Sequence, residues 1–360
     1  MKKILIALTV FFCLAIVQIP TAFSNQEQGS QSASAFVSRE IPARTIPVPS
    51  TVSDELKKLI SKPLNPALRL NPSTNEEWRM LVSQKTEMNA ISFVRFKESF
   101  PVDIEHVVIG GVKAQIVTPK TVSHQNADRV LIHLRGGGYV FNAGEGGLGE
   151  AVLMAHHGKF KVISVDYRMA PEFPFPAALE DSVSVYREVI KAVKPRRVGI
   201  FGTSAGGGLT AAAVLKLQEL NIPLPAVVGL GTPWADLSKT SDSLFTNEFI
   251  DDVLVGYDGL LGACARVYAG DHDLKHKLIS PVYAEYTREF PPAIFTTGSR
   301  DLFLSDTVRL ERKLRLAGVT TLIQIFEGMS HAQYIIASNS PESKEAFEVI
   351  AEFFQKHLER

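Results

Sequence analysis

Cysteine is scarce in this chain of 360 residues, which contains only Cys13 and Cys264. Cys13 lies inside an N-terminal segment that we expect to be removed, so a single thiol remains and no intramolecular disulfide can form. The fold must therefore be held together by the burial of apolar side chains. Cys264 lies in an alanine-rich stretch, where we expect a small buried apolar residue.

The chain also lacks an excess of charge of either sign. Lysine and arginine number 38, aspartate and glutamate number 38, and the formal net charge is zero. No positive field is left to hold phosphates, so we expect no nucleic-acid partner. Apolar residues make up 45% and charged residues 21%, which excludes a disordered chain, a collagen-like chain and a polytopic membrane protein. The length suits one large α/β domain or two smaller ones.

Long apolar runs are missing except at the N-terminus. Two lysines precede an apolar run at 4–19, and small residues follow at positions 22 and 24. This order is typical of a signal peptide over residues 1–24 and predicts an exported protein, either periplasmic or secreted. The alternative is an uncleaved anchor, although the run is slightly short for a membrane span. Cleavage would leave 36 basic and 38 acidic residues, a net charge of −2, and no stable membrane span.

Composition divides the rest of the chain into three parts. Residues 25–50 are rich in Gln, Ser, Ala and Pro and are expected to form a flexible leader. Residues 51–100 carry helical patterns broken by prolines, with short helices expected near 54–60 and 75–81. Residues 101–360 contain the apolar runs of a large α/β domain.

The pattern of this last part predicts a mostly parallel central sheet with helices on both faces. Two alternating strands at 102–109 and 112–118 flank Gly110-Gly111, which indicates a β-hairpin. The short runs that follow are continuously apolar and alternate with helical stretches, as buried parallel strands do. Ligands bind at the carboxyl ends of such strands. The runs are Val130–Leu134, Lys161–Val165, Val198–Phe201, Val227–Leu230, Ile294–Thr297 and Leu322–Phe326.

A candidate nucleophile follows the third of these runs. Gly202-Thr203-Ser204-Ala205-Gly206 matches Gly-x-Ser-x-Gly between a predicted strand and a predicted helix. The small residues on both sides of the serine allow a sharp turn that lifts its hydroxyl above the sheet. The turn also places Ser204 at a helix N-terminus, which favours negative charge.

A triple glycine follows the first run, in Arg135-Gly136-Gly137-Gly138-Tyr139. The ending typical of a phosphate-binding loop is missing. We interpret the segment as an oxyanion loop, because it precedes the nucleophile and bare glycine backbone exposes N–H groups. The expected donors are the amides of Gly137, Gly138 and Ala205.

A serine hydroxyl needs a base, and the base needs an orienting acid. Of nine histidines, only His331 follows a strand late in the chain. The order Ser, Asp, His predicts Asp301 as the acid, since it lies just after the fifth run. Asp306 is the second candidate and Asp236, after another strand, is a weaker one.

These motifs together resemble one known family. The chain is similar to the hormone-sensitive-lipase-type α/β-hydrolases, the family IV carboxylesterases, in the subgroup with the motif Gly-Thr-Ser-Ala-Gly. The resemblance rests on the segments 166–172, 202–207, 280–284, the pair at 301–302 and His331. It implies an α/β-hydrolase fold with an N-terminal helical cap at 51–100 and a catalytic domain at 101–360. It also implies a triad of Ser204, His331 and Asp301, and it allows a homodimer.

One position departs from the family, because Arg135 replaces the usual histidine before the glycines. Arg135 either pins the loop to a backbone carbonyl or a carboxylate, or faces the pocket and favours acidic substrates. We include Arg135 among the candidate substrate-binding residues, together with Tyr139, Phe141 and Trp234.

The expected function is hydrolysis of short- to medium-chain or cyclic (lactone) esters through an acyl-enzyme, with no cofactor and no metal. Two alternatives stay open. The same triad could cleave an amide or an aryl-formamide. The chain could also be a non-catalytic homologue that binds a small molecule.

Overall fold

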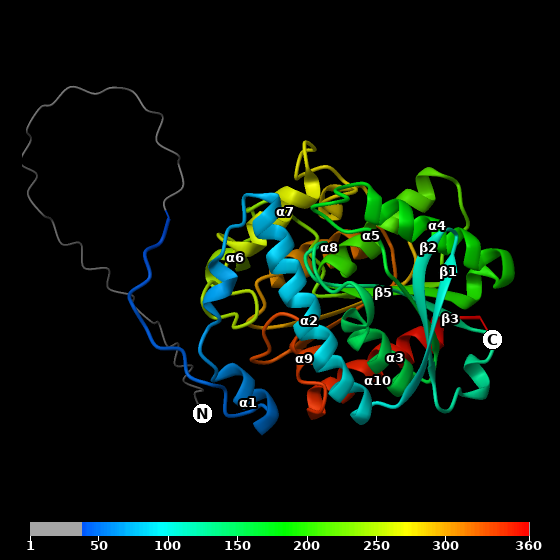
Figure 1. The fold of residues 1–360 in the computed structure, drawn as a ribbon, viewed down its shortest axis with the longest axis horizontal. Coiled ribbons are helices and arrows are strands. Elements are labelled where there is room, and N and C mark those ends of the chain that lie inside the picture. Colours follow the sequence, from blue (N-terminus) through cyan, green and yellow to red (C-terminus); the bar gives the residue numbers. More distant parts are fainter. Residues whose placement is uncertain (1–37, 360) are drawn as a thin grey trace, which may run out of the picture. The chain divides into compact units, whose positions relative to one another are not determined.

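The computed structural model describes residues 38–359 (Figure 1). The predicted signal peptide and the first half of the leader lie outside the described residues. Residues 38–53 contain no helix or strand. From Ile46 onward the chain forms one compact unit.

The central element is an eight-stranded sheet in the order β1-β2-β4-β3-β5-β6-β7-β8. The pairs β1–β2 and β2–β4 are antiparallel, and the remaining pairs are parallel. The predicted fold class is therefore confirmed, and each predicted run corresponds to a strand within two residues at either end. The strands are β1 Val102–Ile109, β2 Val112–Pro119, β3 Val130–Leu134, β4 Lys161–Val165, β5 Val198–Thr203, β6 Val227–Gly231, β7 Ala293–Gly298 and β8 Thr321–Phe326.

The hairpin between β1 and β2 follows from two glycines. Ile109 pairs with Val112, so Gly110 and Gly111 alone make the turn. Both have positive φ, 58° and 83°, as a tight hairpin turn requires. The hairpin forms one edge of the sheet (Figure 1).

Helices cover both faces of the sheet, and each face has its own apolar core (Figure 1). Successive side chains of a strand point to opposite faces; in β5, Ile200 packs into one core and Phe201 into the other. Helices α4, α5 and α8 contribute to the first core, and α3 and α10 to the second. The helices from α3 onward are α3 Gly149–Gly158, α4 Ala177–Ala192, α5 Ala205–Glu219, α6 Ser243–Thr246, α7 Leu260–Ala269, α8 Leu304–Leu316, α9 Gln333–Ile336 and α10 Pro341–His357.

Two helices precede the sheet, in the stretch where a cap is expected. They are α1 Asp54–Ile60 and α2 Asn75–Ser99, with the short 3-10 helix η1 Pro66–Arg69 between them. Thr74 and Glu77 form a reciprocal capping box at the start of α2, which fixes where this helix begins. Trp78 of α2 is buried in one core and Phe93 in the other. Helix α2 therefore shares the packing of the main domain while it crosses one face of the molecule (Figure 1).

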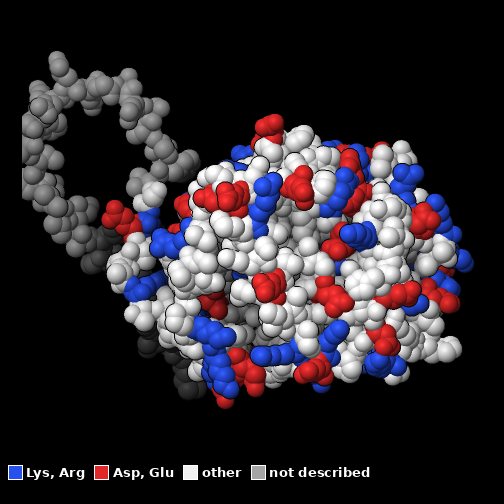
Figure 2. Space-filling model, viewed as in Figure 1, with Lys and Arg blue, Asp and Glu red and all other residues white. Residues whose placement is uncertain are grey.

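Figure 2 shows the face that α2 crosses, where basic and acidic side chains are intermixed and neither sign gathers into one large patch. Among the described residues, no helix has the length and apolar character needed to cross a bilayer.

Candidate active site

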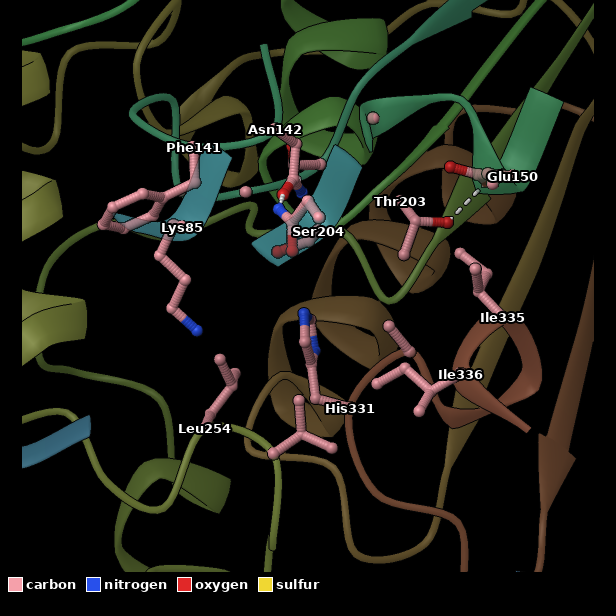
Figure 3. A pocket seen from close by; sticks show the side chains of 18 of the residues that line it. Lys85, Phe141, Asn142, Glu150, Thr203, Ser204, Leu254, His331, Ile335 and Ile336 are labelled. Carbon is pink, nitrogen blue, oxygen red and sulfur yellow. Dashed lines mark hydrogen bonds between the residues drawn. The ribbon is translucent and has the colours of Figure 1, made fainter. Parts of the chain in front are cut away.

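The serine of the Gly-x-Ser-x-Gly motif lies in a strained turn between β5 and α5. Ser204 has φ 63° and ψ −125°. This backbone conformation is unfavourable for any residue other than glycine. The turn lies so close to the end of the neighbouring strand β3 that a Cβ on Gly202 or Gly206 would lie 2.2 or 2.0 Å from the carbonyl oxygen of Leu134. Glycine is therefore required at both positions. The turn presents the Ser204 side chain to a cavity at the carboxyl ends of the strands (Figure 3).

The structure brings His331 and Asp301 together beside this cavity. Nδ1 of His331 lies 3.0 Å from Oδ1 of Asp301. Asp301 is itself held by the Thr297 hydroxyl at 2.7 Å and the Phe303 amide at 2.8 Å. Nε2 of His331 has no hydrogen-bond partner among the described residues, and Figure 3 shows the imidazole facing Ser204.

Two further residues contact this histidine, and sequence reasoning missed both. The Thr232 hydroxyl lies 2.5 Å from Nδ1 of His331. Asp251, fully buried, accepts hydrogen bonds through Oδ2 from the amides of Leu302 and His331 at 2.9 and 3.3 Å. Asp251 lies in the loop between α6 and α7, and no motif marks it. The only signal in the sequence was the carboxyl pair Asp251-Asp252 in a long segment without predicted elements.

Burial, and after it the neighbouring charge of Asp301, raise the pKa of Asp251 to about 6, while His331 opposes the shift. Amides of its own loop, from Val253 and Leu254, also donate to Oδ1. The Asp251 carboxyl group therefore accepts from four backbone amides. These hydrogen bonds hold the buried group in one position.

The other two acid candidates are not beside the histidine. Asp306 lies in α8 and accepts from the amides of Ala235 and Asp236 at 3.1 and 2.8 Å. Asp236 bonds Ser238, Thr240, Tyr283 and Arg309. Both carboxyl groups stabilise the loop after β6, so of the three candidates only Asp301 contacts His331.

The glycine loop has the backbone expected of an anion site. Gly137 and Gly138 have φ of 115° and 63°, and the Gly137 carbonyl accepts from the amides of Val140 and Phe141 at 3.1 and 2.9 Å. Within the described chain the amides of Gly137 and Gly138 donate to no protein acceptor. Ala205 is the first residue of α5, so its amide has no acceptor inside the helix.

Arg135 has the first of its two predicted roles, since it pins the loop to a backbone carbonyl and a carboxylate and does not line the cavity as a substrate-binding residue would. Its side chain is fully buried. The guanidinium donates to the Gly144 carbonyl at 2.7 Å, to Asp166 at 2.8 Å, to Ser164 at 3.2 Å and also to Gln115. Arginine provides five donors in a rigid fork, and these contacts pin the loop from behind.

Tyr139 and Trp234 are also buried away from the cavity, and the prediction that they bind substrate is wrong. Tyr139 is 1% exposed and stacks on Tyr268 with ring centroids 3.6 Å apart. Trp234 is 0% exposed and stacks on Phe303 at 5.5 Å. Large aromatic side chains stabilise cores by such contacts. Phe141, in contrast, does line the cavity.

The cavity has a volume of about 370 Å³, a size that suits a small ligand. Ser204 and His331 lie between two sides of it (Figure 3). One side carries Phe141, Lys85 and Leu254, and the other Glu150, Thr203, Ile335 and Ile336.

Buried polar groups connect the second side to the glycine loop. The Thr203 hydroxyl donates to Glu150 at 2.6 Å (Figure 3), and Glu150 contacts Nε2 of His133 at 3.0 Å. Nδ1 of His133 lies 2.9 Å from the hydroxyl of Ser164, which accepts from Arg135. The described residues contain no cluster of three or more His, Cys, Asp or Glu side chains that could hold a metal.

Comparison with known proteins agrees with this geometry. The profile of the α/β-hydrolase fold family matches residues 131–335. An acetyl-hydrolase of Streptomyces hygroscopicus is 30% identical over 278 residues, which are 75% of this chain and 90% of that protein. An esterase of Acinetobacter venetianus is 27% identical over 259 residues, 72% of this chain and 84% of that protein.

Solved structures give the same result. The crystal structure of esterase E25 has 41% sequence identity and a TM-score of 0.86, over 89% of this chain and 99% of that one. An esterase from the bacterial hormone-sensitive lipase family has 28% identity and a TM-score of 0.73, over 85% and 99%. The structure of EstE5 soaked with p-nitrophenyl butyrate has 26% identity and a TM-score of 0.70, with the same coverage.

The chain therefore belongs to the α/β-hydrolases, in the hormone-sensitive-lipase group of esterases. It is a serine esterase that hydrolyses carboxylic esters. The family predicted from the motifs is confirmed.

Proposed function

We propose that the protein hydrolyses short- to medium-chain carboxylic esters, including cyclic ones, by two-step acyl transfer at Ser204. One observation carries the assignment of the residues. His331 has one ring nitrogen fixed by Asp301 and the other without a partner, on the side of the Ser204 hydroxyl. That arrangement suits a general base acting on a nucleophile.

In the first step, Nε2 of His331 takes the proton of the Ser204 hydroxyl while the oxygen attacks the ester carbonyl. The amides of Gly137, Gly138 and Ala205 stabilise the resulting oxyanion. The proton then passes from His331 to the alcohol, which leaves. Water, activated by the same histidine, releases the acid. Asp301 keeps the proton on Nδ1 and stabilises the charged imidazole.

The cavity volume of about 370 Å³ supports a limit on substrate size. Crystals of the relative EstE5 were soaked with p-nitrophenyl butyrate, a short-chain ester. A ladder of p-nitrophenyl esters from acetate to palmitate, followed by a panel of lactones, tests the proposal. We expect turnover of the short chains to be highest and to vanish in Ser204→Ala. Maximal turnover of palmitate, or activity retained in Ser204→Ala, would contradict it.

An amide or aryl-formamide hydrolase would use the same triad. The discriminating measurement is kcat/KM for an ester and its matched anilide. We expect the ester to be preferred, and a preference for the anilide would favour the alternative.

We also propose that the N-terminal segment directs export, since residues 1–24 have the order of a signal peptide. N-terminal sequencing of the protein recovered outside the cytoplasm tests this, with Asn25 expected as the first residue.

A further inference from the structure

Among the described residues that line the cavity, the lysine Lys85 has no hydrogen-bond or ion-pair partner. Lys85 and Asn89 lie one turn apart on α2, so they present side chains to the same region, and both line the cavity. Figure 3 shows the Lys85 amino group pointing into the open space between Phe141 and Leu254, on the side toward His331.

The neighbouring polar groups leave this ammonium unsatisfied. The Asn89 side-chain amide donates to Asn142 at 2.7 Å, and the Asn142 amide donates to the Gly136 carbonyl at 3.1 Å. Lys85 is half-buried, and no carboxylate or carbonyl of the described residues accepts a hydrogen bond from it or pairs with it. Three N–H donors therefore remain for a ligand.

Phe141 and Leu254, both apolar, flank the Lys85 side chain in the cavity (Figure 3). Leu68, Leu254 and Leu261 line the cavity. Arg135, which lies behind the glycine loop, is bonded to Asp166 and Gly144 and does not line the cavity. A partly desolvated ammonium beside apolar walls gains most from an anionic ligand group.

The opposite side of the cavity has the reverse character. Glu150 lies there with Ile335 and Ile336 (Figure 3). A substrate carboxylate on that side would meet a carboxyl group and apolar surface. The electrostatics therefore orient an anionic substrate with its charged end toward Lys85 and its neutral end toward Ile335.

We infer that this site selects esters that carry a carboxylate a few bonds from the scissile carbonyl, and that Lys85 is the residue that recognises it. This inference rests on the proposed function, because it requires that Ser204 attacks an ester bound in this cavity. Lys85, rather than Arg135, is then the residue that recognises acidic substrates.

The test compares two matched pairs of esters in the full chain. Ethyl pentanoate and monoethyl glutarate differ by a carboxylate on the acyl side, and p-tolyl acetate and 4-acetoxybenzoate by a carboxylate on the alcohol side. For each pair, the measured quantity is kcat/KM of the anionic ester divided by kcat/KM of the neutral ester. We expect this ratio to fall roughly three- to tenfold in Lys85→Met for one of the two pairs. Lys85→Glu should lower the ratio further, and added salt should lower it in the wild type only.

Arg95→Met is the matched control, since Arg95 is an exposed residue of the same helix that does not line the cavity. It should leave both ratios unchanged. Equal effects of Lys85→Met on anionic and neutral esters in both pairs would overturn the inference while leaving the esterase function intact.

A binding measurement separates the two hypotheses. On the Ser204→Ala background, titration calorimetry with monoethyl glutarate and with 4-acetoxybenzoate reports recognition without turnover. We expect weaker binding of at least one of them when Lys85→Met is added. Unchanged binding of both contradicts the role of Lys85. Hydrolysis of no ester in the wild type, with Lys85-dependent binding, contradicts the proposed function alone.

Discussion

Asp251 and Asp301 hold adjacent amides of one turn. Asp251 accepts from the amide of Leu302 at 2.9 Å, and Asp301 accepts from the amide of Phe303 at 2.8 Å. Asp251 also accepts from the amide of His331 at 3.3 Å. One buried carboxyl group therefore contacts both loops that present the histidine and its acid, and it does so without lining the cavity.

Asp251 is accordingly a positioning residue. In Asp251→Asn, the side-chain NH₂ replaces one acceptor oxygen, so amides that now donate to it would face a donor. We expect kcat to fall by roughly 10- to 100-fold with little change in KM, because the substrate does not touch this group. Steady-state kinetics with p-nitrophenyl butyrate measure both constants.

Asp252→Asn is the control for this prediction. The Asp252 carboxyl group accepts from the Gln333 side chain at 2.8 and 2.9 Å and does not contact His331 or Asp301. The substitution should therefore leave kcat within about twofold. A rise in KM with unchanged kcat in Asp251→Asn would contradict a positioning role.

A second buried carboxyl group makes stability depend on pH. Burial raises the pKa of Asp306 to about 8, against the opposing hydrogen bond from Ser241. Between about pH 4 and pH 8 the folded state then holds a proton that the unfolded state has released, so this group contributes less stability as pH rises. Asn at this position keeps an acceptor for the amides of Ala235 and Asp236.

We therefore expect the free energy of unfolding of the wild type, minus that of Asp306→Asn, to decrease from pH 4 to pH 8. Denaturant unfolding at several pH values measures this difference. A difference that stays constant, or that increases with pH, would mean that Asp306 ionises normally in the folded state.

Arg135 should affect all substrates alike. Arg135→Met removes the guanidinium that donates to Asp166 and to the Gly144 carbonyl. Breaking a buried ion pair such as Arg135–Asp166 lowers the free energy of unfolding by about 3–5 kcal/mol. The glycine loop loses its support, so we expect kcat to fall by a similar factor for ethyl pentanoate and for monoethyl glutarate. A selective loss on the anionic ester would return the recognition of acidic groups to Arg135.

The sequence could predict the sheet and the position of the site because both depend on local signals. The run Val130–Leu134 matches β3 at both ends, and the motif around Ser204 requires a strand, a turn and a helix. The order of Ser204, Asp301 and His331 along the chain, together with the position of Asp301 just after the fifth run, was sufficient to choose the acid that contacts the histidine.

The residues that sequence reasoning missed or misplaced depend on packing between distant segments. Asp251 and His331 are 80 positions apart and meet only in the folded chain. Trp234 and Tyr139 follow strand ends, as pocket residues do, but the loops fold inward and bury both rings. Lys85 lies on a helix whose sequence carries no motif, so only the folded arrangement shows that it enters the cavity.

The Thr232 hydroxyl provides a last test, because it shares Nδ1 of His331 with Asp301. Two acceptors at this nitrogen favour the tautomer with the proton on Nδ1, which leaves Nε2 free to take the proton of Ser204. Thr232→Val should lower kcat by roughly two- to tenfold, whereas Thr232→Ser, which keeps a hydroxyl, should restore most of the rate.

The effects on kcat of removing the two acceptors, Asp301 and Thr232, should also be non-additive. Asp301→Asn allows a side-chain amide to donate to Nδ1, which moves the proton to Nε2 and should lower kcat by about 10⁴-fold. In that background the Thr232 hydroxyl no longer faces an N–H group, so adding Thr232→Val should change kcat little. A double variant in which the two losses multiply would mean that Thr232 acts on another part of the site, and that the shared contact at Nδ1 does not set the tautomer.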